Sequence, residues 1–359
     1  MDKLKQYLYS LATDKRKGII PGTLKAFLYL FSLIYGLITR ILAKAGSLRQ
    51  ISLNCRLISI GNITLGGTGK TLLVEYVAQY LKSQNRRLVI LTRGYKRKAF
   101  TCNLAPLSCA AMGDEPYMLY KKLGNIPVVV DKDRIRAAER AVKDYDVDTF
   151  ILDDGFQQWR LKKDLEIVTI NATCPFGNRM LIPRGILRED LLALKRADIF
   201  VLTKADLTED TPRTKDFLSK LNPAALVVSA THEPIGFYAL GEPSRIIQAQ
   251  ELGAENVALI CGIGDPDSFE ALVRKSGLKI GLSLRFPDHY QYSEEDLRGI
   301  VEQARACNIK SIITTEKDAV RFDNFKFQIG IVRVFVLKIA IKIENEPQFQ
   351  KRLLSIYSL

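Results

Sequence analysis

The run GGTGKT at 66–71 has the residue types and the spacing of a phosphate-binding loop. It follows an apolar, β-rich run at 57–60 and precedes a helix-like segment at 72–78. In that context the backbone N–H groups of a glycine-rich turn and of a helix N-terminus converge on phosphate oxygens. Lys70 is then expected to neutralise the β- and γ-phosphates, and the Thr71 hydroxyl to bind Mg²⁺. The sequence therefore predicts a site for a nucleoside triphosphate with Mg²⁺.

The predicted loop includes the two residues before this run, although one of them departs from the usual pattern. The full pattern G-x-x-x-x-G-K-[ST] places glycine six positions before the lysine, where this chain has Thr64. The alternative interpretation is a strand-to-helix turn with incidental glycines. The residues expected to bind the nucleotide are Thr64, Leu65, Gly66, Gly67, Thr68, Gly69, Lys70 and Thr71.

Two acidic pairs lie where chemistry is expected. An apolar strand at 148–152 ends in Asp153 and Asp154, and in phosphate-loop proteins an Asp at such a strand end holds the Mg²⁺ shell. Adjacent strand residues point to opposite faces, so we expect only one of the two to meet the metal directly; the alternative is a solvated turn. Asp114 and Glu115 open a helical pattern, which helix capping alone would also explain.

Further polar residues follow predicted strands, at the edge where ligands of open α/β sheets gather. Arg93 ends one strand, and a glycine- and proline-broken loop at 177–189 carries three arginines whose spacing suits phosphate contacts. The TKAD sequence at 203–206 resembles the N-K-x-D base-reading motif of GTP-binding proteins. Of the two histidines, His289 follows a strand end, whereas His232 is predicted to be a loop residue.

Composition indicates a globular protein with an anionic partner. Apolar residues make up 47% of the chain and charged residues 26%, and the net charge is +14. The partner could be nucleic acid, an acidic membrane or a phosphorylated substrate. Aromatic residues are not interleaved with the basic ones and no nucleic-acid-binding module is present, so nucleic acid is not expected. Six cysteines without a C-x-x-C pattern argue for reduced thiols and against zinc or a disulfide framework.

The basic excess is concentrated at the N-terminus. Residues 1–50 hold nine Lys or Arg against two Asp, and within them 26–38 is an apolar, aromatic run with basic flanks. Thirteen helical residues rise only about 20 Å, short of a hydrocarbon core of about 30 Å. We therefore expect a helix lying in the surface of an anionic membrane, the alternative being a buried core helix.

Strands and helices alternate along the rest of the chain, which predicts an α/β fold with a mostly parallel sheet of the P-loop NTPase kind. A composition break at 236–251 marks a linker, after which β-α-β-α-β predicts a second, smaller α/β domain. The predicted divisions are a membrane-associated segment at 1–48, a P-loop kinase domain at 49–240 and a smaller domain at 241–359.

Eight motifs in order resemble the tetraacyldisaccharide 4′-kinase family of the lipid A pathway in Gram-negative bacteria. They are GGTGKT, TRGYKRK, GDEP, LDDGFQQ, PRGILRE, VLTKAD, FPDHY and TTEKD. The resemblance extends from the N-terminal apolar run to Asp318, and it includes Thr64 in place of the first loop glycine. It implies transfer of the ATP γ-phosphoryl group to the 4′-hydroxyl of an acylated glucosamine disaccharide 1-phosphate. The implied enzyme is a monomer, peripheral at the cytoplasmic face of the inner membrane.

The resemblance also implies roles for individual residues. Asp114 matches the family's general base and His289 its partner, in a pair that would join two domains on closure. Asp153 and Asp154 match the acidic strand end that organises the metal, and Glu115 is a further Mg²⁺ contact. Arg93, Arg188 and Glu189 fall in motifs that would contact substrate or phosphate. The rival hypotheses are a GTP-dependent nucleotide switch and a membrane-associated NTPase.

Overall fold

The structure is a computed structural model, and it describes residues 7, 9–94, 109–253, 256–322 and 332–358. The chain forms two compact units. The first unit comprises Met1–Arg93, Leu123–Thr231 and Lys342–Leu359, and the second comprises Gly94–Lys122 and His232–Ile341. The TRGYKRK motif lies outside the described residues from its fourth residue onward.

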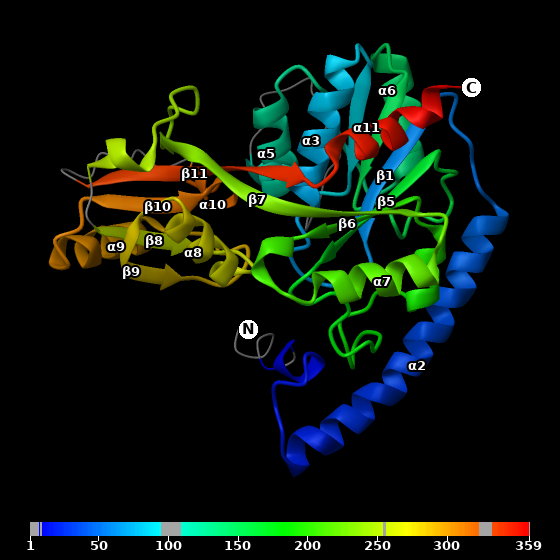
Figure 1. Cartoon of the computed structure of the whole chain (residues 1–359), viewed down its shortest axis with the longest axis horizontal. Helices are drawn as coiled ribbons and strands as arrows, with labels where there is room; N and C mark the ends of the chain where they lie inside the picture. Colours follow the sequence, from blue (N-terminus) through cyan, green and yellow to red (C-terminus); the bar gives the residue numbers. More distant parts are fainter. Residues whose placement is uncertain (1–6, 8, 95–108, 254–255, 323–331, 359) are drawn as a thin grey trace. The chain divides into compact units, whose positions relative to one another are not determined.

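These units differ from the predicted divisions at 49–240 and 241–359. The second unit begins at His232 and takes in 94–122, and the last eighteen residues return to the first. The reason is that two long strands, β7 (Leu226–Ala239) and β11 (Arg333–Ile343), each have residues in both units (Figure 1). Within a continuous strand, the sequence does not indicate the residue at which the chain passes from one unit to the other.

The first unit is built on a parallel sheet in the order β3-β2-β4-β1-β5-β6-β7. Its other strands are β1 (Arg56–Asn62), β2 (Leu88–Thr92), β3 (Val128–Val130), β4 (Thr149–Asp153), β5 (Leu165–Asn171) and β6 (Ile199–Thr203). The strands are buried on both faces, as parallel sheets covered by helices are. The covering helices are α3 (Lys70–Ser83), α6 (Arg134–Asp144), α7 (Thr211–Leu221) and α11 (Glu346–Leu354), with 3₁₀ turns at Leu191–Arg196, Ala205–Leu207 and Ser355–Tyr357.

The second unit holds the strands β7-β11-β10-β8-β9 in that order. Its further elements are β8 (Asn256–Cys261), β9 (Lys279–Arg285), β10 (Ser311–Thr315), α4 (Cys109–Met112), α5 (Asp114–Leu123), α8 (Pro266–Lys275), α9 (Glu294–Ala306), α10 (Glu316–Ala319) and a 3₁₀ turn at Ala249–Leu252. The pairs β8–β9, β8–β10 and β10–β11 are parallel. The predicted α/β fold class and the second β-α-β-α-β unit are confirmed.

The C-terminal helix α11 packs on the helix that follows the phosphate loop. Phe349 is fully buried and its ring lies 5.9 Å from that of Tyr76 in α3, whose hydroxyl donates to Glu346 Oε1 at 2.5 Å. Beyond α11, the Tyr357 hydroxyl lies 2.9 Å from Thr149 Oγ1 at the start of β4. The last residues of the chain therefore complete the unit that contains the first strand.

The N-terminal helix α2 (Ile19–Leu48) is thirty residues long, more than twice the predicted length. The prediction used only the apolar run, whereas the helix continues through the polar flanks. At about 45 Å it is long enough to cross a membrane, and its most apolar window has a mean hydropathy of 1.8. Only 11% of that window is buried, so the alternative of a buried core helix is wrong.

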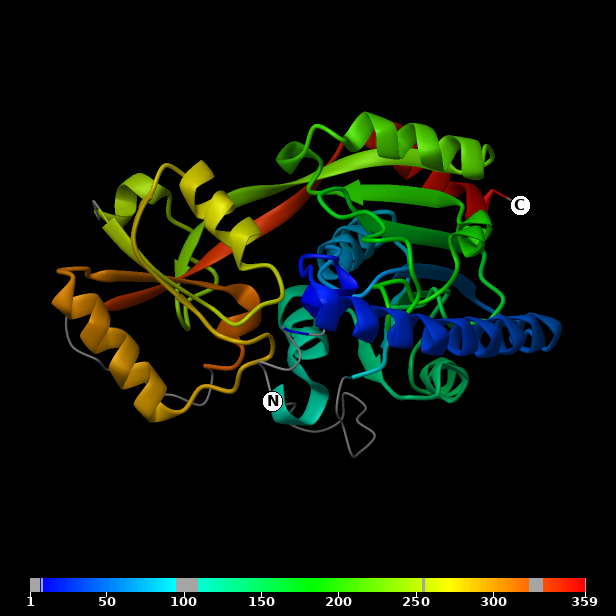
Figure 2. The same ribbon diagram turned by 90° about the horizontal axis from the view of Figure 1, so that it is seen from below.

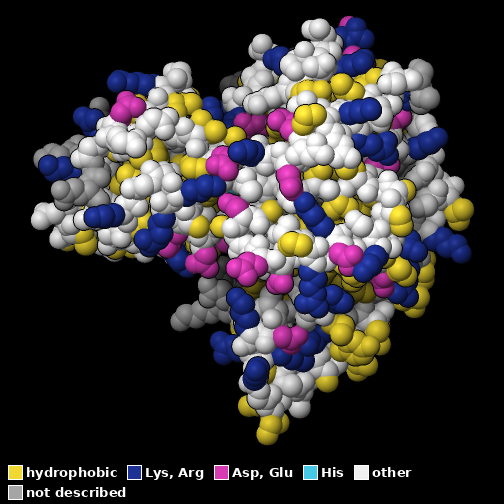
Figure 3. All heavy atoms as spheres, in the orientation of Figure 1, with side chains coloured by type: hydrophobic (Ala, Val, Ile, Leu, Met, Phe, Trp, Pro, Cys, Tyr) yellow, Lys and Arg dark blue, Asp and Glu magenta, His cyan; other side chains and the backbone are white. Residues whose placement is uncertain are grey.

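α2 runs along the rest of the first unit (Figures 1 and 2). One side of the helix contacts that unit, and the other side is apolar and exposed. Ser32 Oγ donates to Leu181 O at 2.9 Å, the Tyr35 hydroxyl donates to Arg188 O at 3.0 Å, and Arg40 pairs with Asp190 at 2.8 Å. The exposed side chains include Phe27, Leu30, Phe31, Leu33, Ile34, Leu37, Ile38, Ile41 and Leu42. They form part of the yellow surface in Figure 3. The helix thus lies beside its own unit with an apolar stripe uncovered.

Candidate functional site

The predicted phosphate loop joins β1 to α3. Gly66 and Gly69 have φ values of 108° and 75°, which side chains rarely adopt, so the two glycines are required by the turn. Buried Asn62, the last residue of β1, accepts a hydrogen bond from Lys70 Nζ at 2.9 Å and donates to Thr64 O at 2.7 Å. The lysine is therefore oriented by the strand that precedes the loop.

Thr64 itself has a structural explanation. It forms an antiparallel bridge with Leu187, and the neighbouring Leu65 N–H donates to Ile186 O at 2.8 Å. Thr64 is not among the residues with positive φ, so its backbone does not need glycine. The loop at 177–189 pairs with the phosphate loop through these two residues.

The TKAD motif supports the phosphate loop from the end of β6. Thr203 Oγ1 donates to Thr68 O at 3.0 Å, and Lys204 Nζ reaches Gly67 O at 3.5 Å. Thr68 Oγ1 also lies 2.9 Å from Thr169 Oγ1 on β5. The ends of β5 and β6 therefore hold the loop backbone.

Asp154 is the acidic residue that meets the loop's cations. Its carboxylate pairs with Lys70 at 3.2 Å and with Arg188 Nη1 at 3.0 Å from both oxygens. Burial alone would raise the pKa of Asp154, but the charges of Lys70 and Arg188 outweigh it and lower the pKa to about 2. Asp154 is thus a carboxylate at neutral pH, and it holds two cations where a phosphate would compete for them.

Asp153 ends β4, where it is paired in register with Ile60 of β1, two residues before that strand ends. It is buried, and its Oδ2 accepts from Thr92 Oγ1 at 3.0 Å. Thr71, Asp153 and Asp154 offer only oxygen ligands, which is the chemistry that Mg²⁺ prefers. Among the described residues no group of three or more His, Cys, Asp or Glu could hold a metal. These three residues nevertheless fit Mg²⁺, since that ion usually takes one or two carboxylates together with substrate phosphates.

The remaining residues predicted near substrate lie in different surroundings. Arg93 follows β2 and is exposed. Glu189 is buried and accepts from Trp159 Nε1 at 3.2 Å and from both Nη atoms of Arg196 at 3.0 Å. Those contacts give Glu189 a structural function in the loop; contact of either residue with substrate stays a prediction.

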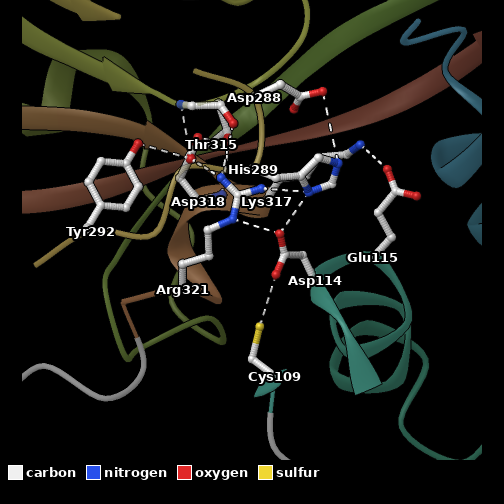
Figure 4. A network of polar contacts seen from close by, with 11 residues as sticks. Cys109, Asp114, Glu115, Asp288, His289, Tyr292, Thr315, Lys317, Asp318 and Arg321 are labelled. Atoms are coloured by element: carbon white, nitrogen blue, oxygen red, sulfur yellow. Dashed lines mark hydrogen bonds and ion pairs between the residues drawn. The ribbon is translucent and has the colours of Figure 1, made fainter. Parts of the chain in front are cut away.

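In the second unit, Asp114 and His289 are in direct contact (Figure 4). Asp114 begins α5, and its Oδ2 lies 3.0 Å from His289 Nδ1. His289 follows β9 in a turn with φ of 60°, fixed by its N–H donating to Gly262 O at 3.1 Å. The prediction that this pair joins two domains is wrong, because both residues belong to the same compact unit.

The pair is electrostatically coupled. The hydrogen bond that His289 donates to Asp114 raises the pKa of His289 against the opposing effect of burial. Burial raises the pKa of Asp114, but the hydrogen bond with His289 and the charge of Arg321 bring it well below its usual range. The imidazole is therefore the more basic member of the pair.

Comparison with known proteins identifies the family. A family model described as Tetraacyldisaccharide-1-P 4′-kinase matches residues 24–358. The chain belongs to that family. It is similar to the Tetraacyldisaccharide 4′-kinase of Halothermothrix orenii, at 37% identity over 96% of this chain and 95% of the relative. The one from Elusimicrobium minutum is 35% identical over 94% and 92%.

A solved structure of the same family agrees in fold. It is LpxK from Aquifex aeolicus in complex with ATP, with a TM-score of 0.73, 28% identity, and coverage of 93% of this chain and 99% of that one. The match over nearly the whole chain confirms the family resemblance, and a nucleotide-switch function is not favoured.

Some functional candidates in this 4′-kinase family member have no simple sequence signal. His232, predicted to be in a loop, is instead buried within β7, a long strand at Leu226–Ala239 that runs into the predicted linker. Glu115 pairs with Lys317 in the second unit, so Mg²⁺ binding by Glu115 stays a prediction. Arg321 and Asp318 lie beneath the Asp114–His289 pair. Asp318 had two sequence signals, the TTEKD motif and the helix-capping T-x-x-D spacing at 315–318, whereas Arg321 had none.

Proposed function

We propose that this chain transfers the γ-phosphoryl group of ATP to the 4′-hydroxyl of tetraacyldisaccharide 1-phosphate, giving the bis-phosphorylated lipid A precursor. The observation that carries the proposal is membership of the 4′-kinase family over residues 24–358. Full-length relatives bear the same name at 35–37% identity. The phosphate loop and the Asp114–His289 pair supply the two chemical functions that such a transfer needs.

On the donor side, the chain's contribution is positioning and charge neutralisation. Loop N–H groups from 64–71 bind the triphosphate oxygens, and Lys70 and Arg188 move from Asp154 toward the phosphates. Thr71, Asp153 and Asp154 would hold Mg²⁺, which would supply neutralisation of phosphate charge. Phosphoryl transfer depends on this electrostatic environment more than on covalent chemistry by the protein.

On the acceptor side, the Asp114–His289 pair accepts the proton of the attacking hydroxyl. The 4′-oxygen forms a bond to the γ-phosphorus, the bond between that phosphorus and the β,γ-bridging oxygen breaks, and ADP leaves. The proton goes to the pair, in which Asp114 acts as the general base and His289 as its hydrogen-bonded partner. The pair belongs to the second unit and the phosphate loop to the first.

The apolar stripe of α2 suits a substrate that stays in the bilayer because it carries acyl chains. Three polar contacts fix α2 to the first unit along 32–40, which favours a helix lying in the membrane surface over one that crosses it. Lys15, Arg16 and Lys17 precede the helix and favour an anionic surface. The expected location is the cytoplasmic face of the inner membrane, where ATP is present, and the expected state is a monomer.

The membrane proposal is tested by vesicle co-sedimentation. Leu30→Ser and Leu37→Ser remove exposed apolar surface, and each is expected to weaken binding to anionic vesicles about tenfold, near the 1.5 kcal/mol gained by burying a leucine. Val142→Ser, at an exposed position of α6, is the matched control and should bind as the wild type does. Equal vesicle binding by all four proteins would refute the proposal that the apolar stripe of α2 binds the membrane.

The activity is tested with γ-labelled ATP, Mg²⁺ and the disaccharide lipid in mixed micelles. Label is expected in the lipid, and its transfer should depend on Lys70 and His289. Label that appears only as inorganic phosphate would favour an NTPase. Preference for GTP without lipid phosphorylation would favour a nucleotide switch.

A further inference from the structure

The loop at 177–189 is joined to the phosphate loop through its backbone. The Arg188 N–H donates to Ile63 O at 2.7 Å, and the Leu65 N–H donates to Ile186 O at 2.8 Å. These two hydrogen bonds flank the antiparallel bridge between the two loops. Three consecutive residues of the loop are therefore paired with the start of the phosphate loop.

The side chain of Arg188 reaches from this loop to the phosphate site. Its Nη1 lies 3.0 Å from each carboxylate oxygen of Asp154, which also pairs with Lys70 at 3.2 Å. The donors of a guanidinium form a planar fork of fixed geometry, so the position of the backbone decides what they can reach. Placement of the Arg188 backbone is therefore part of the construction of the nucleotide site.

Both backbone groups of Arg188 are hydrogen-bonded. Its N–H is bonded to Ile63, directly after β1, and its carbonyl oxygen accepts from the Tyr35 hydroxyl of α2 at 3.0 Å. Tyr35 is half-buried, and burial raises the pKa of its hydroxyl, so the hydroxyl keeps its hydrogen and donates at neutral pH. The Arg188 backbone thus lies between the strand that leads into the phosphate loop and the N-terminal helix.

Two small residues let α2 approach the loop closely. A Cβ at Gly36 would lie 2.6 Å from Leu181 Cδ1, so a side chain at this position would require Leu181 to move. Ser32 is 3% exposed, and its Oγ accepts from the Arg184 N–H at 3.0 Å. Ser32, Tyr35 and Gly36 are spaced i, i+3 and i+4, which places them on one face of the helix. That face of α2 holds the loop.

We propose that Tyr35 is a positioning residue for the nucleotide site, which holds the Arg188 backbone where the guanidinium reaches the phosphates of ATP. The helix α2 then has two functions on two sides: its apolar side binds the membrane, and its Tyr35 side orients a cation of the donor site. The inference rests on the proposed function, because it takes Arg188 to bind the phosphates of ATP. It does not depend on the acceptor, so ATP affinity and lipid phosphorylation can fail separately.

The test is calorimetric titration of ATP with Mg²⁺ into the full chain in detergent micelles. Tyr35→Phe removes only the hydroxyl, and it should raise the Kd for ATP about threefold to tenfold, as loss of one neutral hydrogen bond does. Thr39→Ala is the matched control, because it also removes a hydroxyl from α2. Thr39 Oγ1 donates to Tyr35 O and Gly36 O, both in the backbone of the helix itself, so this variant should bind ATP as the wild type does.

A double-mutant cycle separates positioning from a general structural effect. Arg188→Ala keeps the carbonyl that accepts from Tyr35 but removes the side chain that is positioned, so adding Tyr35→Phe to it should change the Kd less than twofold. An equal loss in both backgrounds, or an unchanged Kd in Tyr35→Phe alone, overturns the positioning assignment.

Steady-state kinetics in mixed micelles provides a second readout. Tyr35→Phe should raise the KM for ATP and leave the KM for the disaccharide lipid within about twofold. The expected change in ATP affinity without any label in the lipid supports the positioning assignment and refutes the proposed transfer. Label in the lipid with an unchanged ATP affinity in Tyr35→Phe does the reverse.

Discussion

Asp154 forms ion pairs with Lys70 and Arg188, the two cations expected to bind the phosphates of the nucleotide. Replacing Asp154 is therefore expected to strengthen nucleotide binding, whereas most mutations in a binding site weaken it. In Asp154→Asn the carboxylate no longer competes with phosphate for Lys70 and Arg188, its partners at 3.2 and 3.0 Å. We therefore expect ATP without a divalent ion to bind this variant more tightly than it binds the wild type.

The magnitude follows from the charge removed. The side chains of Lys70, Arg188 and Asp154 are 15%, 24% and 37% exposed, so solvent screens the site substantially. In a water-like dielectric, each phosphate charge about 4–6 Å from the carboxylate is repelled by about 0.7–1 kcal/mol. Two such charges account for about 1.4–2 kcal/mol, which corresponds to at least a tenfold lower Kd in the variant.

The assay is isothermal titration of ATP in EDTA and again in excess Mg²⁺. The tenfold gain in ATP affinity should appear only in EDTA, because in excess Mg²⁺ the variant also loses a ligand of the metal. For the same reason its kcat with Mg²⁺ should fall by at least about 100-fold. Asp198→Asn, which breaks the Asp198–Arg352 pair in the same unit, is the control and should leave both affinities unchanged. Unchanged or weaker ATP binding by Asp154→Asn in EDTA would refute the competition.

Three other outcomes are expected. Lys70→Ala should lose more kcat/KM in mixed micelles than His289→Ala, because charge neutralisation matters more than base catalysis in this reaction; the reverse order would contradict this. Burial raises the pKa of Asp14, but Lys25 and Arg184 lower it to about 2. The ionised Asp14 therefore stabilises the fold above about pH 4, and this stabilisation is lost as the pH falls toward 2. Denaturant unfolding of Asp14→Asn should show a deficit of about 1 kcal/mol at pH 6, after allowance for its exposure, that shrinks on acidification. Phe349→Ala should destabilise the first unit by about 3–5 kcal/mol, measured by thermal unfolding with and without ATP; a loss below 1 kcal/mol would show that α11 is dispensable.

Local sequence patterns predicted the phosphate loop and the second α/β unit well because each depends on residues close together in the chain. The loop is specified by glycines at positions of positive φ and by the lysine that begins α3. Thr64 could not be understood in this way, since its conformation depends on Leu187, more than a hundred positions later.

The second unit shows the same limit more clearly. Asp114 was placed in the phosphate-loop domain because it lies between two of that domain's strands in sequence. The structure instead places α5 in the second unit with His289 and Arg321, contacts that span 175 and 207 positions. Nothing in the sequence marked Arg321 as a buried residue. A buried arginine and a solvated arginine cannot be told apart in sequence, because the carboxylates that pair with a buried arginine are brought to it only by the fold.

The return of residues 342–359 to the first unit has a consequence for how the protein is made. The ribosome makes the phosphate loop long before residues 342–359, so a nascent chain that already contains the loop still lacks α11 and the Tyr357 contact with β4. The nucleotide-binding unit can reach its final stability only after residues 342–359 have been translated. A chain that stops before α11 would therefore lack the packing of Phe349 and be open to proteolysis, so a stable nucleotide site depends on synthesis of that helix.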